Sequence, residues 1–160
     1  QPIPAARVGD GVFFMVMPAG RPNHGVCAVG DDVYVIGGRV ADDDFVAPVL
    51  KYSVSSNTWT EAGNMPTARC ILSVCVLGTH IYCIGGLRGS RSRSQRLAVV
   101  ERFDTESGVW RSLTPMPTVR YGAAAFVLEG KIYVSGGKGR GGRYTDVVSG
   151  MIPCLGPGTR

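Results

Sequence analysis

Short apolar runs that end in two glycines recur three times along the chain. They occupy residues 33–38, 81–86 and 131–137, and each is rich in β-branched and aromatic residues. Between them, apolar positions either alternate with polar ones or run together briefly, which is typical of strands. No segment keeps the 3.6-residue period of an amphipathic helix. The pattern therefore predicts a repeat protein built from short β-strands.

Further landmarks accompany each apolar run in a fixed order and spacing. A Met-Pro pair opens each repeat, and an arginine follows four residues after the methionine. The first glycine of the pair comes sixteen residues after that arginine in all three copies. Such regular spacing marks a structural repeat. The landmarks are Met17-Pro18, Arg21 and Gly37, then Met65-Pro66, Arg69 and Gly85, and finally Met116-Pro117, Arg120 and Gly136.

Each repeat is predicted to form four strands, named a to d in chain order. Strand a begins at the arginine, and strand b is the apolar run before the glycine pair. Strand c carries Tyr52 or Phe103, and strand d carries Trp59 or Trp110 seven residues later. Pairs rich in Gly, which favour tight hairpins, join strands a and b. The expected ranges are 21–29, 69–77 and 120–128 for strand a and 48–53 and 99–104 for strand c, with turns at Gly30-Asp31, Gly78-Thr79 and Glu129-Gly130.

A four-stranded sheet of this size cannot bury both faces alone, so it must stack on its neighbours. The apolar run, double glycine and spaced aromatic and tryptophan resemble the kelch repeat over roughly residues 12–148. The resemblance implies an all-β, kelch-type β-propeller of about three four-stranded antiparallel blades, as a partial ring or half-propeller. The expected units are an opening strand of an incomplete blade in 1–20, blade 1 in 21–62, blade 2 in 63–113, a partial blade 3 in 114–148 and an irregular tail in 149–160.

The third repeat departs from the pattern after its glycine pair. Met151 stands where the earlier repeats have an aromatic residue, and Gly158 stands where they have tryptophan. Gly11 likewise occupies the tryptophan position before Met17, although the apolar run 12–16 still suits a strand d. Propeller rings close with about four to eight blades, so three leave two sheet faces uncovered. Two explanations stay open: the chain is a portion of a longer one, or a second copy completes the ring.

The apolar, cysteine and charge content of the chain indicates its cellular compartment and the kind of partner it binds. The chain lacks the run of about 18 apolar residues that a membrane span needs, and its first residues lack the features of a signal peptide. Its five cysteines include no CxxC pair, which indicates buried thiols in a reducing compartment, so we expect a cytoplasmic protein. The net charge of +5 is uneven: residues 1–80 carry 5 basic and 7 acidic side chains, and residues 81–160 carry 12 and 5. This asymmetry bears on partners rather than on fold.

The three repeat arginines are the first candidates for a binding site. By resemblance to kelch propellers, Arg21, Arg69 and Arg120 would lie on one rim of the central channel, where the d–a and b–c loops meet. Their forked donors suit carboxylates or phosphates. Asn23 and Tyr121 lie on the same edge as weaker candidates. The alternative is structural: the arginines hydrogen-bond carbonyl groups and brace neighbouring blades.

The b–c loops differ sharply in charge. The first is acidic through Asp42, Asp43 and Asp44, whereas the other two are basic and contain no carboxylate before Asp146. An acidic segment of a partner protein would therefore dock against blades 2 and 3; alternatively, the loops are charged only for solubility. Serines 90, 92 and 94 among the arginines also form a phosphorylation target. The basic residues are Arg88, Arg91, Arg93 and Arg96 in the second loop and Lys138, Arg140 and Arg143 in the third.

The sequence gives weaker signals for phosphate binding, metal binding and reactive cysteines. The glycine-rich stretch 136–143 lacks the helix that a phosphate-binding loop requires, and the acidic triplet lacks the ligand spacing of a calcium loop. Cys27 and Cys75 share one repeat position, as expected of core residues, and Cys70 lies near the rim. No cluster has metal-ligand spacing, so we expect no cofactor and no metal.

The leading hypothesis is a non-catalytic protein-interaction module that binds its partner through the loop rim. The resemblance implies substrate receptors of ubiquitin ligases or cytoskeletal scaffolds as the relevant classes. Kelch propellers also include copper oxidases and sugar-acid isomerases, but His24 and His80 lie far apart in the repeat frame, which disfavours a copper site. Nucleic-acid binding by the basic half is the third alternative; its arginines lack interleaved aromatic residues.

Overall fold

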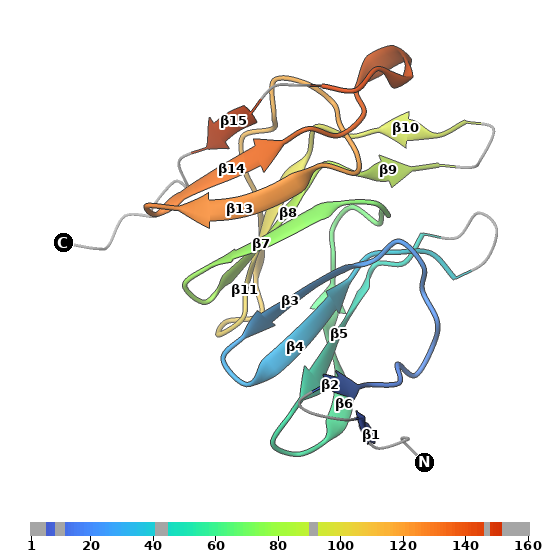
Figure 1. The fold of residues 1–160 in the computed structure, drawn as a ribbon, viewed down its shortest axis with the longest axis vertical. Coiled ribbons are helices and arrows are strands. Elements are labelled where there is room, and N and C mark those ends of the chain that lie inside the picture. The colour runs from blue at the N-terminus through green and yellow to red at the C-terminus, as the bar shows by residue number, and fades with distance from the viewer. Residues whose placement is uncertain (1–5, 9–11, 41–44, 90–92, 146–147, 152–160) are drawn as a thin grey trace.

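The computed structural model describes residues 6–8, 12–40, 45–89, 93–145 and 148–151, and the statements below concern these residues. The fold is all-β, as predicted. Three antiparallel sheets stand side by side, with the second sheet between the first and the third (Figure 1). Each sheet is one repeat, and we call them blades 1, 2 and 3. The first strand of each blade lies beside the first strand of the next, as at the hub of a propeller.

Blade 1 is a meander of four strands in the order β3-β4-β5-β6. These are β3 (Gly25–Val29), β4 (Asp32–Ile36), β5 (Pro48–Ser53) and β6 (Thr58–Asn64). Gly30 has a φ of 57° in the tight turn between β3 and β4, as the sequence predicted. Strand β6 continues two residues beyond the expected end of this blade at residue 62.

Blade 2 repeats this arrangement in the order β7-β8-β11-β12. Its strands are β7 (Ser73–Leu77), β8 (His80–Ile84), β11 (Val100–Asp104) and β12 (Trp110–Ser112). A separate two-stranded ribbon, described with the candidate site, leaves the blade between β8 and β11.

Blade 3 contains three strands in the described part of the chain: β13 (Ala124–Leu128), β14 (Lys131–Ser135) and β15 (Val148–Met151). A 3-10 turn, η1 (Arg140–Gly142), lies between β14 and β15. Met151 pairs with Ile132 as Phe103 pairs with Ile81, so it occupies the aromatic position of strand c. The segment expected to be irregular from residue 149 therefore begins as a strand.

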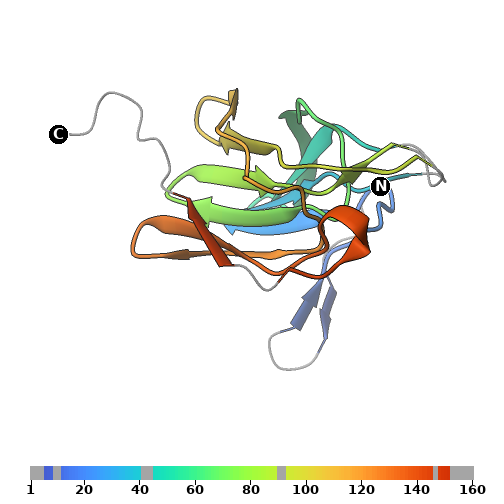
Figure 2. The same ribbon diagram turned by 90° about the horizontal axis from the view of Figure 1, so that it is seen from above.

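The N-terminal residues form a hairpin of their own rather than a strand of a blade. Strand β1 (Ala6–Val8) pairs with β2 (Val12–Phe14), and Figure 2 shows this hairpin projecting away from the three blades. The sequence predicted the strand at 12–16 but not its partner.

Strand a of every blade begins four residues later than the sequence predicted, because the chain turns just after the arginine. The residue two positions after each arginine has a positive φ: 61° at Asn23, 50° at Ile71 and 62° at Gly122. The backbone N–H of Ile71 donates to the Asn23 carbonyl at 2.9 Å, and that of Gly122 donates to the Ile71 carbonyl at 3.0 Å. The turn therefore links successive blades at the hub before each strand starts.

The core lies between the blades, and each blade contributes one face to it. Tyr34 and Ile36 of blade 1 pack with Ile81 and Phe103 of blade 2, and the Tyr34 and Phe103 rings meet edge to face at 6.3 Å. Cys27 packs against this cluster, as its repeat position predicted.

A second cluster joins blades 2 and 3 in the same way. Tyr82 and Ile84 pack with Ile132 and Val134, and Cys75 belongs to this cluster. Because neither face of a four-stranded sheet is buried without its neighbour, the apolar area between blades is the main stabilising term of the fold.

Within each complete blade an aromatic pair spans strands c and d. The rings of Tyr52 and Trp59 lie 5.1 Å apart, and those of Phe103 and Trp110 lie 5.0 Å apart. Cross-strand aromatic pairs stabilise sheets beyond their buried area. The seven-residue spacing in the sequence thus corresponds to one cross-strand contact.

Candidate functional site

The connections between strands b and c of blades 2 and 3 project from one edge of the molecule. In blade 2 this connection carries the ribbon of β9 (Leu87–Arg88) and β10 (Gln95–Arg96), and in blade 3 it carries η1. Figure 1 shows the ribbon and η1 on the same side of the fold. We call the described residues of these two loops, 87–89, 93–96 and 138–145, the basic rim.

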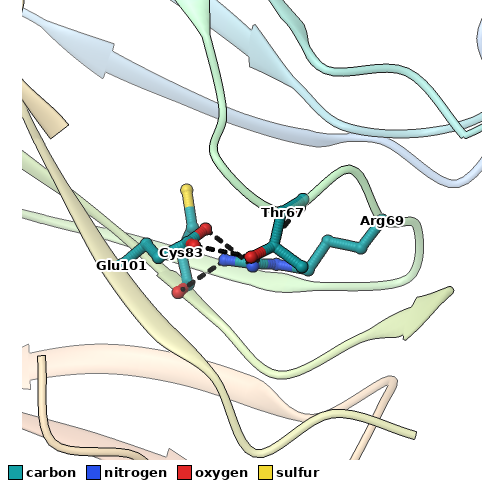
Figure 3. Close-up of polar contacts among 4 residues, drawn as sticks. All are labelled: Thr67, Arg69, Cys83 and Glu101. Atoms are coloured by element: carbon teal, nitrogen blue, oxygen red, sulfur yellow. Dashed lines mark hydrogen bonds and ion pairs between the residues drawn. The ribbon is translucent and has the colours of Figure 1, made fainter. Parts of the chain in front are cut away.

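Arg69 lies beneath this rim and is fully buried. Its Nη1 donates to Glu101 Oε2 at 2.8 Å, and its Nη2 donates to the Cys83 carbonyl at 3.0 Å (Figure 3). Thr67 Oγ1 donates to the other carboxylate oxygen of Glu101 at 2.6 Å. The guanidinium therefore neutralises a buried carboxylate and ties strands β8 and β11 to the loop that enters blade 2.

The other two repeat arginines are also buried and bind carbonyl groups of their own blades. Arg21 Nη1 donates to the Pro48 carbonyl at 2.6 Å. Arg120 Nη1 donates to the Gly136 carbonyl at 3.3 Å, and its Nη2 donates to Thr118 Oγ1 at 2.9 Å. Burial lowers the pKa of Arg21, while the nearby Glu61 opposes that shift.

These contacts correct the expectation that the three arginines present exposed donors on the rim. Arg21, Arg69 and Arg120 are 6%, 0% and 2% exposed, so their side chains brace the blades from within. The side-chain hydrogen bonds given above each join groups within one blade. The sequence left both roles open because an arginine that recurs in every repeat suits either.

Contacts between blades come instead from the backbone of the same arginines. The Gly38 N–H donates to the Arg69 carbonyl at 3.0 Å, and the Gly86 N–H donates to the Arg120 carbonyl at 2.9 Å. The glycine pair of one blade thus receives the loop that begins the next blade. We call each glycine pair a glycine turn and each segment from Met-Pro to the arginine a Met-Pro segment.

The remaining predicted residues lie closer to the surface. Arg88, Arg93 and Arg140 are exposed, and Arg88 Nε donates to Gln95 Oε1 at 2.9 Å. Asn23 is exposed at the turn described above. Arg91 lies outside the described residues. The basic rim therefore brings together three of the predicted arginines.

Tyr121 joins the two loops of the basic rim. It is half-buried, and the guanidinium of Arg96 lies over its ring at 5.8 Å from the centroid. The Tyr121 N–H donates to the Lys138 carbonyl at 3.1 Å, and the Lys138 N–H donates back to the Tyr121 carbonyl at 2.9 Å. Tyr121 thus acts mainly as a packed support for the cations on either side.

A pocket of about 670 Å³ opens between the loop that enters blade 3 and the third b–c loop. Tyr144, on its wall, is 79% exposed, and Lys138 Nζ lies 4.6 Å from its ring centroid. A hydrogen bond with Tyr144 raises the pKa of Lys138, which keeps the ammonium charged. The pocket is lined by Ala98, Pro117, Thr118, Val119, Arg120, Gly139, Arg140, Arg143, Tyr144 and Thr145.

The described residues that line this pocket include three arginines and no aspartate or glutamate. Residues 87–98 and 138–145 contain arginines and lysine but no aspartate or glutamate. Cations without local counter-ions create a positive potential that attracts anionic groups. Tyr144 was missed from sequence because it falls outside the repeat pattern; its signal was an aromatic residue within a glycine-rich basic loop.

Comparison with known proteins agrees with this architecture. A family profile described as the KLHDC2/KLHL20/DRC7 Kelch-repeats domain matches residues 17–151, which is most of the chain. The chain belongs to the kelch-repeat family.

Several kelch relatives align over most of this chain. Human Kelch-like protein 33 is 34% identical over 132 residues, covering 80% of this chain and 24% of that protein. Mouse Kelch-like protein 35 is 33% identical over 133 residues, covering 83% and 22%. Chicken Kelch-like protein 15 is 31% identical over 113 residues, covering 68% and 22%. The chain therefore spans about a quarter of the length of these relatives.

The four cysteines in the described part of this kelch chain, Cys27, Cys70, Cys75 and Cys83, are packing residues. Burial raises the pKa of the Cys27 thiol to about 12 and that of Cys75 to about 11, and it also raises the pKa of Cys70 and Cys83. Since the thiolate is the reactive form, these groups are poor nucleophiles. Cys70 is buried, so its position near the rim does not make it reactive.

The described residues contain neither a metal-binding cluster nor a membrane-crossing helix. No group of three or more His, Cys, Asp or Glu side chains within them is placed to hold a metal ion. None of their helices has the length and apolar character of a membrane-crossing segment.

Proposed function

We propose that this chain is a non-catalytic kelch module that binds an acidic segment of a partner protein through the basic rim. The observation that carries the proposal is the pocket between the loop that enters blade 3 and the third b–c loop. Its walls combine the exposed Tyr144 with Arg140 and Arg143, and no carboxylate lies on either loop of the rim.

The chemistry of these residues favours a carboxylate-bearing chain. Guanidinium groups form short, charge-assisted and bidentate hydrogen bonds with carboxylates. The exposed tyrosine offers apolar area to the backbone and side chains of an extended peptide. Arg88 and Arg93 on the neighbouring ribbon extend the positive surface beyond the pocket. A partner segment with several acidic residues would therefore meet cations along its length.

The relatives support a protein-binding role of this general kind. The proposed classes are adaptor proteins of the substrate-receptor or scaffold type. Free cysteines are typical of proteins in a reducing environment, which is where we expect this chain to act. The pocket and the basic rim, whose charged side chains are all cations, favour protein binding over the enzymatic alternatives.

The proposal predicts selective binding of an acidic peptide. A fluorescein-labelled decapeptide of Glu, Asp and Gly should bind in fluorescence anisotropy, whereas the same peptide with Gln and Asn in place of the acids should not. Replacing both pocket arginines, Arg140→Gln with Arg143→Gln, should weaken binding about tenfold or more through loss of charge-assisted hydrogen bonds. Binding should also weaken as salt is raised, since the rim is exposed.

The matched control is Arg111→Gln with Lys131→Gln, which also removes two positive charges, from exposed positions on β12 and β14 that do not line the pocket. Its affinity for the acidic peptide should match that of the unaltered chain. Equal affinities for the acidic and the amide peptide would contradict the proposal, and so would tighter retention of single-stranded RNA than of the acidic peptide.

A further inference from the structure

The ribbon of blade 2 carries an exposed serine close to the proposed binding site. Ser94 directly precedes β10, and the pairing of the ribbon begins at the next residue, where Gln95 lies opposite Arg88. Within the described part of the chain, the Ser94 hydroxyl makes no side-chain hydrogen bond. Figure 1 shows the ribbon projecting from the edge of the fold. The hydroxyl is therefore accessible to another macromolecule.

Cations surround this serine. Arg93 precedes it and is exposed, and Arg88 Nε donates to Gln95 Oε1 at 2.9 Å, which holds a second guanidinium at the same part of the ribbon. In the sequence, Arg91 stands three residues before Ser94, and residues 87–98 contain no aspartate or glutamate. Protein kinases select their substrates partly by such charge patterns. A hydroxyl among arginines suits a serine kinase whose substrate cleft is acidic.

Ser112 shows what the position of Ser94 adds. Ser112 is also exposed and also follows an arginine, Arg111. It belongs to β12, however, where it is paired with Glu101 of β11. A kinase could engage Ser112 only by drawing a strand away from its sheet, whereas Ser94 lies outside the paired residues of its ribbon.

The ribbon is linked to the loop of the pocket through Tyr121. Arg96 of β10 lies over the Tyr121 ring, and Tyr121 exchanges two backbone hydrogen bonds with Lys138. The hydrogen bond with Tyr144 raises the pKa of Lys138, and repulsion by the nearby Arg96 opposes that rise. The two loops are therefore close enough for a charge on one to act on the other.

We propose that Ser94 is a phosphorylation site and that its phosphate weakens the binding of the acidic partner segment to the basic rim. A protein kinase would transfer the γ-phosphoryl group of ATP to Ser94 Oγ. A new O–P bond forms, the bond from the γ-phosphorus to the β–γ bridging oxygen breaks, ADP leaves, and the hydroxyl proton is released.

Phosphoserine has the charge needed for this effect. It carries about −1.5 to −2 charges at pH 7 and three strong acceptor oxygens. Arg88 and Arg93 would form charge-assisted hydrogen bonds with these oxygens and would no longer be available to an acidic segment. The effect on binding rests on the proposed function, whereas the assignment of Ser94 as the acceptor does not.

The acceptor is tested by treating the folded chain with ATP, Mg²⁺ and an arginine-directed serine kinase, the catalytic domain of calmodulin-dependent protein kinase II. Ser90 and Ser92 are replaced by alanine in every chain, so that a phosphate on the ribbon can lie only on Ser94. Mass spectrometry of proteolytic fragments should find one phosphate on the Ser94 fragment and none there after Ser94→Ala. Ser112→Ala is the matched control and should leave the Ser94 phosphate unchanged.

The effect on the rim is tested with the labelled acidic decapeptide in fluorescence anisotropy. Phosphate on Ser94 should weaken its binding about tenfold, because the phosphate repels the peptide and occupies arginines that would bind it. The kinase-treated Ser94→Ala chain should keep the affinity of the same chain before treatment.

The possible failures are distinguishable. A Ser94 fragment without phosphate would overturn the proposal whatever the acidic peptide does. An equal affinity before and after phosphorylation, in a chain that binds the peptide, would overturn the effect on the rim and leave the proposed function intact. An untreated chain that does not bind the peptide would contradict the proposed function and the effect that rests on it, while a phosphate on Ser94 would still support the acceptor.

Discussion

Replacing Glu101 with alanine is expected to destabilise the protein by about 3–5 kcal/mol, because it leaves the guanidinium of Arg69 buried without a counter-ion. Arg69 and Glu101 are 0% and 2% exposed, so water cannot take over the lost contact. Thr67 would also lose the acceptor of its hydroxyl. Urea unfolding, followed by tryptophan fluorescence, measures the free energy of unfolding of the variant and the parent.

The control is an ion pair on the surface of blade 1. Lys51 Nζ lies 2.6 Å from Asp32 Oδ2, with the side chains 34% and 25% exposed. Asp32→Ala should cost about 1 kcal/mol or less, since exposed pairs contribute little.

A Glu101→Leu chain that also carries Arg69→Met should recover most of the lost stability, because an apolar pair of similar volume avoids the desolvation cost. Equal losses for Glu101→Ala and Asp32→Ala would contradict the account of the buried pair.

Replacing Gly85 with alanine should be the second severe change. Gly85 has a φ of 62°, and its added methyl group would collide with the Arg120 carbonyl and lie 3.0 Å from Met116 Cε. We expect a backbone cost of about 1–2 kcal/mol from the left-handed conformation. Crowding at the contact between blades should add about 1–3 kcal/mol.

Gly78 separates these two contributions. Its φ is also 62°, but nothing lies within 4 Å of its added methyl position. Gly78→Ala should therefore show the backbone cost alone in the same urea experiment. If the two alanine variants were equally stable, the glycine turn would not be a contact between blades.

The sequence predicted the strands well because their signals are local. Alternating apolar residues, glycine-containing hairpins and regular spacing each act within a few residues, and strands b and c were found within one residue of their expected bounds. The start of strand a was missed because it depends on a contact with the neighbouring blade. Ile71 adopts a positive φ of 50°, which no local propensity favours.

The candidate site was harder to predict because it depends on burial and on departures from the repeat. The repeat frame placed Arg69 near the rim, but only coordinates show that its head group points inward to Glu101. Glu101 itself has no counterpart in blade 1, where Leu50 occupies the equivalent position. Tyr144 and the pocket beside it likewise lie in a loop that the repeat does not specify.

Successive repeats are blades joined by a Met-Pro segment seated in a glycine turn, and amide hydrogen exchange tests this arrangement most directly. The Gly38 and Gly86 amides donate across blades to the Arg69 and Arg120 carbonyls, so both should exchange slowly. Gly20, in an exposed loop, should exchange rapidly. Exchange at Gly38 and Gly86 as fast as at Gly20 would contradict the stacked-blade account.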